Sequence, residues 1–170
     1  VSHFTALDIT HAACAFAELR LRHTSLLHAL AARAVEDRVL ASFSPGDFAD
    51  LLWAFALLGV HDPPLLSAAV QRLQDEVFLA SLKAREIANV VWALAQLEVD
   101  DERVLLLISK RCIDPDILPH FEQQDIAKVG WAFTRVGVPH EVLMQGMPES
   151  AIQQATFSRH PSSPIKVQDL

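Results

Sequence analysis

The chain has 170 residues, of which 51% are hydrophobic, and a formal net charge of −7 at pH 7. Its longest apolar segment, residues 48–60, contains Asp50 and is shorter than the roughly 18 to 20 residues of a membrane-spanning helix, so we expect no membrane span. The acidic balance argues against a strong nonspecific nucleic-acid binder, which normally carries excess basic residues, but it allows a few well-placed basic contacts. Because the sequence begins at Val1 rather than Met, we expect a fragment or a processed form, whose upstream targeting peptide would not be visible.

The first predicted helix belongs to a motif that occurs four times along the chain. The copies are residues 8–21, 47–60, 86–99 and 125–138. The last three copies contain a tryptophan every 39 residues, at Trp53, Trp92 and Trp131. The first copy is weaker and has Cys14 at the tryptophan position. A fixed period in this range is typical of proteins built from stacked repeats.

Each copy of the motif predicts an amphipathic helix. In the second copy the apolar residues have helical spacing and form one stripe: Phe48, Leu51, Leu52, Phe55 and Leu58. Ser44-Pro45 is a helix-start signal, and Gly59 and Gly137 are helix-end signals. An acidic residue occupies the first turn of every copy, where the helix dipole favours it: Asp8, Asp47, Glu86 and Asp125. An alanine follows each tryptophan, which would let a neighbouring helix approach closely: Ala54, Ala93 and Ala132.

A second helix follows each motif. Its apolar positions also repeat every 39 residues, as in the sets Leu26/Leu65/Val104 and Leu30/Ala69/Ile108. Pro63-Pro64 marks its start in the second copy. A short connector then leads to the next copy through two further sets, Leu40/Leu79/Leu118 and Phe43/Leu82/Phe121. Each unit is therefore predicted to be a hairpin of two antiparallel helices.

We predict an all-α protein, a right-handed-type α-solenoid of about four helical hairpins with a 39-residue period, because a single hairpin cannot cover its own apolar surface. The repeat domain should span residues 1–147, with units at about 4–42, 43–81, 82–120 and 121–147. Gly146 and Pro148 should shorten the last helix. Residues 148–170 should form an extended or disordered tail.

Sequence motifs for catalysis are missing. The chain has no His-Glu-x-x-His, Cys-x-x-Cys, phosphate-binding glycine loop or Gly-x-Ser-x-Gly motif, so we expect a noncatalytic protein with no cofactor, metal or small-molecule substrate. The eight histidines are scattered, which favours surface positions over a metal site. Cys14 and Cys112 occupy positions that are apolar in the other copies, and we interpret both as reduced core thiols rather than as a disulfide.

The tryptophans have two interpretations. They could be stacking platforms for nucleic-acid bases, but their place inside the apolar stripe favours packing in the core.

A variable polar position on the first helix is the first candidate binding feature: His11, Asp50, Asn89 and Lys128. Seven residues later, on the same helix face, the copies have Glu18, Leu57, Gln96 and Arg135. Helical repeats that read RNA one base per unit combine a fixed scaffold with such changing side chains. The alternative is an ordinary solvated helix face.

An arginine row on the second helices is the second candidate: Arg33, Arg72 and Arg111. Stacked helices lie about 8 to 10 Å apart, so these guanidinium groups could follow a phosphate backbone. The alternative is that each arginine lies near the negative end of its helix with its stem packed on apolar neighbours.

The repeated run Asp-Ile/Phe-Ala-x-x-x-Trp-Ala-Phe/Leu-Ala-x-Leu-Gly resembles the octotricopeptide repeat and the related heptatricopeptide-type repeats found beside RAP domains and in FAST-kinase-like proteins. The resemblance covers about residues 4–147, without a RAP domain. It implies an organellar RNA-associated protein, mitochondrial or alternatively chloroplast. Relatives act in RNA processing, stability and translation, and some are built into mitochondrial ribosomes. Of the residues above, only the variable polar position matches the family's variable position.

The sequence therefore predicts a noncatalytic RNA-binding or RNA-scaffolding repeat protein. We expect it to be an accessory subunit of a mitochondrial ribosome. Its partners would be a ribosomal or organellar RNA and other proteins of a large assembly. The alternative is a protein–protein interaction scaffold within an organellar complex, which the net charge of −7 favours.

Overall fold

The computed structural model describes residues 1–137, and within this range the chain is all-helical, with no strand. The second helix of the fourth predicted unit and the predicted tail lie outside the described residues. The elements are α1 (Ala6–Glu18), α2 (Thr24–Ala34), α3 (Asp37–Ser42), α4 (Pro45–Leu58), α5 (Pro63–Leu73), α6 (Glu76–Ser81), α7 (Ala84–Gln96), α8 (Glu102–Cys112), the 3-10 helix η1 (Leu118–His120) and α9 (Gln123–Arg135).

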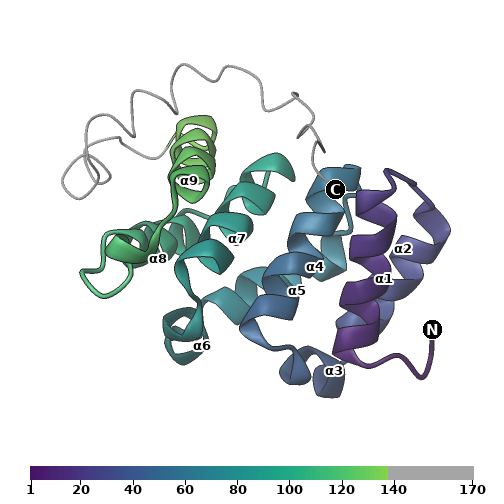
Figure 1. Cartoon of the computed structure of the whole chain (residues 1–170). Coiled ribbons are helices and arrows are strands. Elements are labelled where there is room, and N and C mark those ends of the chain that lie inside the picture. The colour runs from purple at the N-terminus through teal and green to yellow at the C-terminus, as the bar shows by residue number, and fades with distance from the viewer. Residues whose placement is uncertain (138–170) are drawn as a thin grey trace, which may run out of the picture.

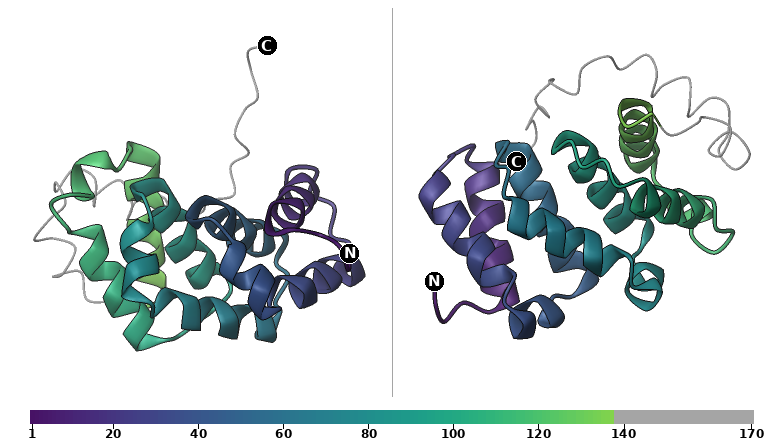
Figure 2. Two further views of the ribbon diagram at one scale, coloured as in Figure 1. Left: turned by 90° about the horizontal axis from the view of Figure 1, so that it is seen from below. Right: turned by 180° about the vertical axis from the view of Figure 1, so that it is seen from behind.

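The helices form two layers. The first layer contains α1, α4, α7 and α9, and each of these helices packs against the next one (Figure 1). We call them the first helices. They begin at Ala6, Pro45, Ala84 and Gln123, each 39 residues after the one before. The second layer contains α2, α5 and α8, which face the viewer when the molecule is seen from behind (Figure 2).

The predicted connectors are themselves helical, which corrects the two-helix unit expected from the sequence. The first two connectors are the short helices α3 and α6, and the third is η1. In α6 the carboxylate of Asp75 caps the helix by accepting hydrogen bonds from the backbone N–H groups of Val77 (3.0 Å) and Phe78 (3.2 Å). The third connector, which contains Pro119, forms only a 3-10 turn.

The starts of the first helices confirm the role expected for their acidic residues. Ser44 caps α4 by accepting a hydrogen bond from Asp47 N at 3.1 Å. In α7 the carboxylate of Glu86 accepts a hydrogen bond from Lys83 N at 2.8 Å, and Asp8 does the same for Thr5 N in α1 at 2.9 Å. These carboxylates therefore satisfy free backbone donors in addition to facing the helix dipole.

The ends of the first helices share a left-handed residue at one position of the repeat. Gly59 and Gly137 adopt φ values of +61° and +71° there, as the helix-end signals predicted. The two other first helices place Arg20 (φ +53°) and Glu98 (φ +56°) at this position. The turn is therefore a property of the repeat and does not depend on glycine.

The core is made by the predicted apolar stripes. Phe55 and Leu94 are at most 1% exposed, and so are the alanines that follow the tryptophans, which allows the first helices to pack closely. The tryptophans themselves are only partly buried and lie at the edge of this core. The prediction of core packing therefore holds in part: each indole packs against the core but is only partly buried. They are Trp53, Trp92 and Trp131.

Candidate nucleic-acid interface

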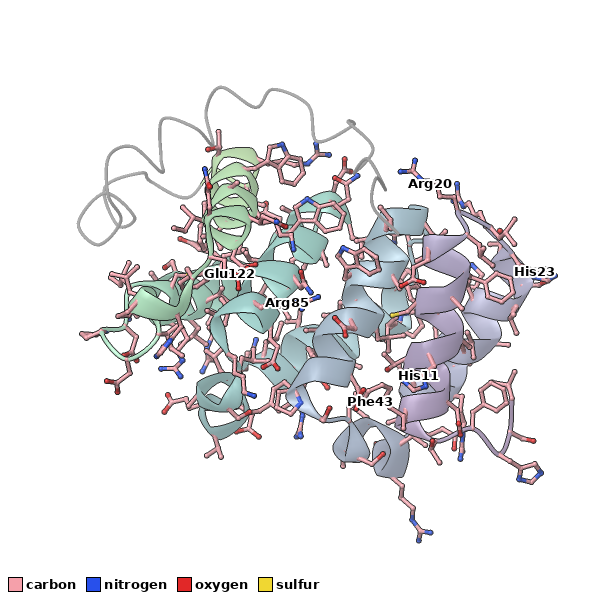
Figure 3. All side chains as sticks on the ribbon, viewed as in Figure 1. His11, Arg20, His23, Phe43, Arg85 and Glu122 are labelled. Carbon is pink, nitrogen blue, oxygen red and sulfur yellow. The ribbon has the colours of Figure 1, made fainter. Side chains whose placement is uncertain are left out.

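The exposed side of the first-helix layer carries one stripe of four residues from each helix, spaced at i, i+4, i+7 and i+11. We call this surface the first-helix face. It consists of Leu7, His11, Cys14 and Glu18 on α1, Gly46, Asp50, Trp53 and Leu57 on α4, Arg85, Asn89, Trp92 and Gln96 on α7, and Gln124, Lys128, Trp131 and Arg135 on α9. Figure 3 shows His11 of α1 and Arg85 of α7 on the same side of the molecule.

Three of the four predicted variable polar residues form a hydrogen-bonded chain across the helices. The Asn89 amide donates to Asp50 Oδ1 at 3.4 Å and accepts from Lys128 Nζ at 2.8 Å. Asn89 is only 5% exposed, whereas His11, at the same position of α1, is exposed. The three side chains are complementary as hydrogen-bond partners, because the Asn89 amide has a donor for the Asp50 carboxylate and an acceptor for the Lys128 ammonium group. Asn89 links the helices and has little surface left to read a base.

Lys128 is half-buried at one end of this chain. Burial lowers the pKa of Lys128 below its ordinary value of 10.5, and the positive charge of Arg85 adds to this effect. The carboxylates of Asp125 and Asp50 oppose it. The ammonium group is thus held in a partly desolvated position where an additional anion would be stabilising.

The aromatic row of the first-helix face brings two indoles together. The ring centroids of Trp92 and Trp131 are 6.3 Å apart, with an angle of 38° between the planes. The Arg135 guanidinium lies 5.4 Å from the centroid of the Trp131 ring. Arg135 also donates to Ala95 O at 3.0 Å and pairs with the exposed Glu98 carboxylate at 3.3 Å.

An open cleft of about 470 Å³ adjoins Arg135 between the ends of α7 and α9. It is lined by Ala95, Glu98, Val99, Asp100, Arg135 and Val136. The candidate Gln96 is exposed at the same end of α7.

Arg85 is a basic residue of this face that the sequence analysis missed, although its position four residues before Asn89 places it on the same stripe.

The arginine row is engaged within the protein. Each arginine pairs with an acidic residue three positions later, in the pairs Arg33–Glu36, Arg72–Asp75 and Arg111–Asp114. The side chains of the three arginines are 17–26% exposed. This arrangement favours the second interpretation, in which the row stabilises helix ends.

Each arginine of the row also contacts a segment outside its own helix. Arg111 Nη2 donates to Ala80 O in α6 at 2.8 Å, and Arg72 lies 4.3 Å from the centroid of the Phe78 ring. Arg33 Nε donates to Phe4 O at 3.2 Å, before α1. Arg33 and Arg111 therefore contact the segment before the first helix of their own unit, whereas Arg72 contacts the connector that follows its helix.

The two cysteines are free thiols, as predicted. Burial raises the pKa of Cys112 to about 12, and that of the half-buried Cys14 to about 11, with Asp50 contributing to the second shift. Cys14 Sγ lies 3.7 Å from Asp50 O. Both thiols are protonated at neutral pH and are poor nucleophiles.

Two further findings apply to residues 1–137. No group of three or more His, Cys, Asp or Glu side chains there is arranged to hold a metal ion. No helix of this range combines the length and the apolar character that crossing a membrane requires.

Over residues 1–137, the fold and this face define an all-helical protein whose stacked first helices expose polar and aromatic rows. A family model described as RNA-editing substrate-binding complex 6 protein matches residues 1–160. The chain therefore belongs to this family of RNA-associated helical proteins. No curated protein shows significant similarity to the chain. The predicted RNA-associated helical class is thus confirmed, whereas kinship with the octotricopeptide repeats stays a prediction.

Proposed function

We propose that this protein is a noncatalytic RNA-binding or RNA-scaffolding subunit of an RNA-editing substrate-binding complex. The family description names such a complex, and it favours this assembly over the mitochondrial ribosome that the sequence resemblance suggested. We keep the mitochondrion as its location, because the resemblance implies an organellar protein.

The observation that carries this proposal is the first-helix face. It presents a variable polar position on each first helix and a tryptophan on three of the four, which resembles the layout of RNA-binding helical repeats. In this mechanism a single-stranded segment of RNA lies across the first helices, and its phosphates and bases contact side chains of successive units. Four first helices cover only a few nucleotides, so other subunits would supply the remaining affinity.

A role in binding rather than catalysis fits the chemistry of this face. Its one thiol, Cys14, is protonated at neutral pH because its pKa is raised to about 11. Its lysine, Lys128, donates to an amide of the neighbouring helix. Both groups contact the neighbouring first helix.

The test is RNA affinity as a function of salt. We expect fluorescence anisotropy with a labelled single-stranded RNA of about 12 nucleotides to show binding that weakens as salt rises from about 50 to 200 mM, with a log–log slope of about 0.7 per phosphate contact. A matched duplex should bind more weakly, because its bases are not available for stacking. Absence of measurable RNA binding at the lower salt concentration would exclude the proposal.

The alternative function is a protein–protein scaffold, and one observation favours it. Leu19 and Leu21, at the end of α1, are 68% and 53% exposed. Exposed leucines of this kind suit an apolar partner surface. Assembly with other subunits of the complex that is insensitive to salt, together with absent RNA binding, would select this alternative.

A further inference from the structure

The first-helix face has two halves of opposite charge. Its stripes on α7 and α9 carry three basic side chains and no acidic one: Arg85, Lys128 and Arg135. Its stripes on α1 and α4 carry the acids Glu18 and Asp50, with His11 as the one basic group. A phosphate backbone is attracted to the first of these halves and repelled by the second.

Three acidic groups act on the basic half: Glu98 on Arg135, and Asp125 and Asp50 on Lys128. Glu98 pairs with Arg135, but its side chain is 80% exposed and that of Arg135 is 43% exposed. Such an ion pair contributes little and can exchange for a phosphate. Asp125 is 5% exposed and accepts a hydrogen bond from Glu122 N at the start of α9. Asp50 lies across the helix boundary and bonds to Asn89.

The basic half also holds the paired indoles. Trp92 and Trp131 lie 6.3 Å apart at the edge of the core, so each ring packs on the protein and is still partly accessible. Trp53 occupies the same position of α4, next to Asp50 and the exposed Leu57. The three indoles therefore share their position in the repeat but differ in the charge around them, which makes Trp53 a natural control.

The basic groups lie around the indoles at different depths. Lys128 uses one of its three N–H donors on Asn89, which leaves two for a ligand. Arg85 is exposed one turn before Asn89, and Arg135 lies above the Trp131 ring. Stacking surfaces flanked by cationic donors are the combination that binds single-stranded nucleic acid without reading a particular sequence.

We propose that the α7–α9 half of the first-helix face is the RNA-contacting site, and that the α1–α4 half does not contact RNA. Two unpaired bases stack on Trp92 and Trp131, while Arg85 and Lys128 hold the adjoining phosphates. The ligand class is a short single-stranded RNA segment with little sequence preference, since stacking accepts any base. This inference rests on the proposed RNA-binding function and narrows it to one half of the face.

The test compares matched tryptophan variants of the full chain: Trp92→Ala, Trp131→Ala and the control Trp53→Ala. The probe is the labelled single-stranded RNA of mixed sequence. Loss of one stacked base should weaken binding about 5- to 150-fold in the first two variants. The control should bind within about twofold of the unmodified protein, although all three variants lose a partly buried indole.

The outcomes separate the two proposals. Equal weakening in all three variants, or a larger loss in Trp53→Ala, would overturn this inference while RNA binding by the face stands. Absence of RNA binding by the unmodified protein would remove both.

For charge, Arg85→Gln and Lys128→Gln should each lower the salt slope by about 0.7, whereas Arg103→Gln on α8 should leave it unchanged.

Fluorescence quenching gives a second measurement that does not depend on the stability of alanine variants. With Trp53→Phe, RNA should still quench the emission of the two remaining indoles. With Trp92→Phe combined with Trp131→Phe, only Trp53 emits, and RNA should leave its emission unchanged. Quenching of Trp53 in the double variant would place RNA on the acidic half and contradict the inference.

Discussion

The end of the helix stack differs from its middle at positions that are equivalent in sequence. Ala15 of α1 and Ala93 of α7 occupy the same position of the repeat, yet Ala15 is exposed and Ala93 is fully buried. Leu19 is 68% exposed, whereas its equivalents Leu58 and Leu97 are 8% and 4% exposed. This side of an inner helix packs on the preceding first helix, and α1 has no such neighbour among residues 1–137.

The other end of the stack shows the mirror image. Ala17, Ala56 and Ala95 are nearly inaccessible, whereas Thr134 of α9 is exposed at the equivalent position. An inner first helix therefore uses one alanine side for the helix before it and another for the helix after it. The neighbour, rather than the residue type, decides which of these positions is buried.

The largest expected effect is on a phenylalanine pair. Phe55 is fully buried in α4, and Phe16, its equivalent in α1, is only partly buried. Phe55→Ala should lower the free energy of unfolding by about 3 to 5 kcal/mol, and Phe16→Ala by less than about 2 kcal/mol. Urea denaturation measures both. Equal losses would show that α1 is covered in solution.

The next effect tests close packing between the first helices. Ala93→Leu forces extra atoms between α7 and α4 and should cost about 1 to 3 kcal/mol, whereas Ala15→Leu, on the exposed side of α1, should be nearly neutral. Thermal unfolding of the two variants gives the comparison. A tolerated leucine at position 93 would mean that the first helices are farther apart than the structure shows.

The difference between features set within one helix and features set by neighbouring helices also explains how much of the molecule could be predicted from the sequence. The apolar stripe of α4 and the acid at each helix start depend on spacing within one helix, and the sequence analysis identified both. The helical connectors were missed because they are at most six residues long and have no clear periodicity. The half-burial of Trp92 depends on the neighbouring helices, which periodicity does not describe.

The candidate site was predicted in part for the same reason. The repeat located the variable polar row. It did not predict that Asn89 would hydrogen-bond to Asp50 and Lys128, since these contacts join residues 39 positions apart. The arginine row was visible as a pattern with two interpretations. Only the contacts in the structure, such as the ion pair of Arg111 with Asp114 and its hydrogen bond to Ala80 O, distinguish between them.

A third prediction compares the polar position of an inner helix with that of α1. Asn89→Ala removes the acceptor of half-buried Lys128 and the donor to Asp50, so it should cost about 1 to 3 kcal/mol. His11→Ala, at the exposed equivalent position, should change stability by less than about 0.5 kcal/mol. Chemical denaturation near pH 7 measures both values. A neutral Asn89→Ala variant would show that the hydrogen-bonded chain contributes no stability.

The smallest effect concerns the left-handed residue after each first helix, where the copies should respond with opposite signs. Arg20 has φ +53°, a conformation that costs a residue with a side chain about 1 to 2 kcal/mol, while glycine loses about 0.5 to 1 kcal/mol more backbone entropy on folding. Arg20→Gly should therefore stabilise the protein by about 0.5 to 1 kcal/mol.

Gly59→Ala is the matched change in the reverse direction. An added Cβ at Gly59 meets no atom within 4 Å, so its cost of about 1 kcal/mol would come from the backbone alone. Glu98→Gly should gain less than Arg20→Gly, because it also removes the ion pair with Arg135. Differences of this size shift the thermal midpoint by a few degrees, which calorimetry resolves. If Arg20→Gly and Gly59→Ala both destabilise, the left-handed turn is not shared by the end and the middle of the stack, and α1 ends differently from α4 in solution.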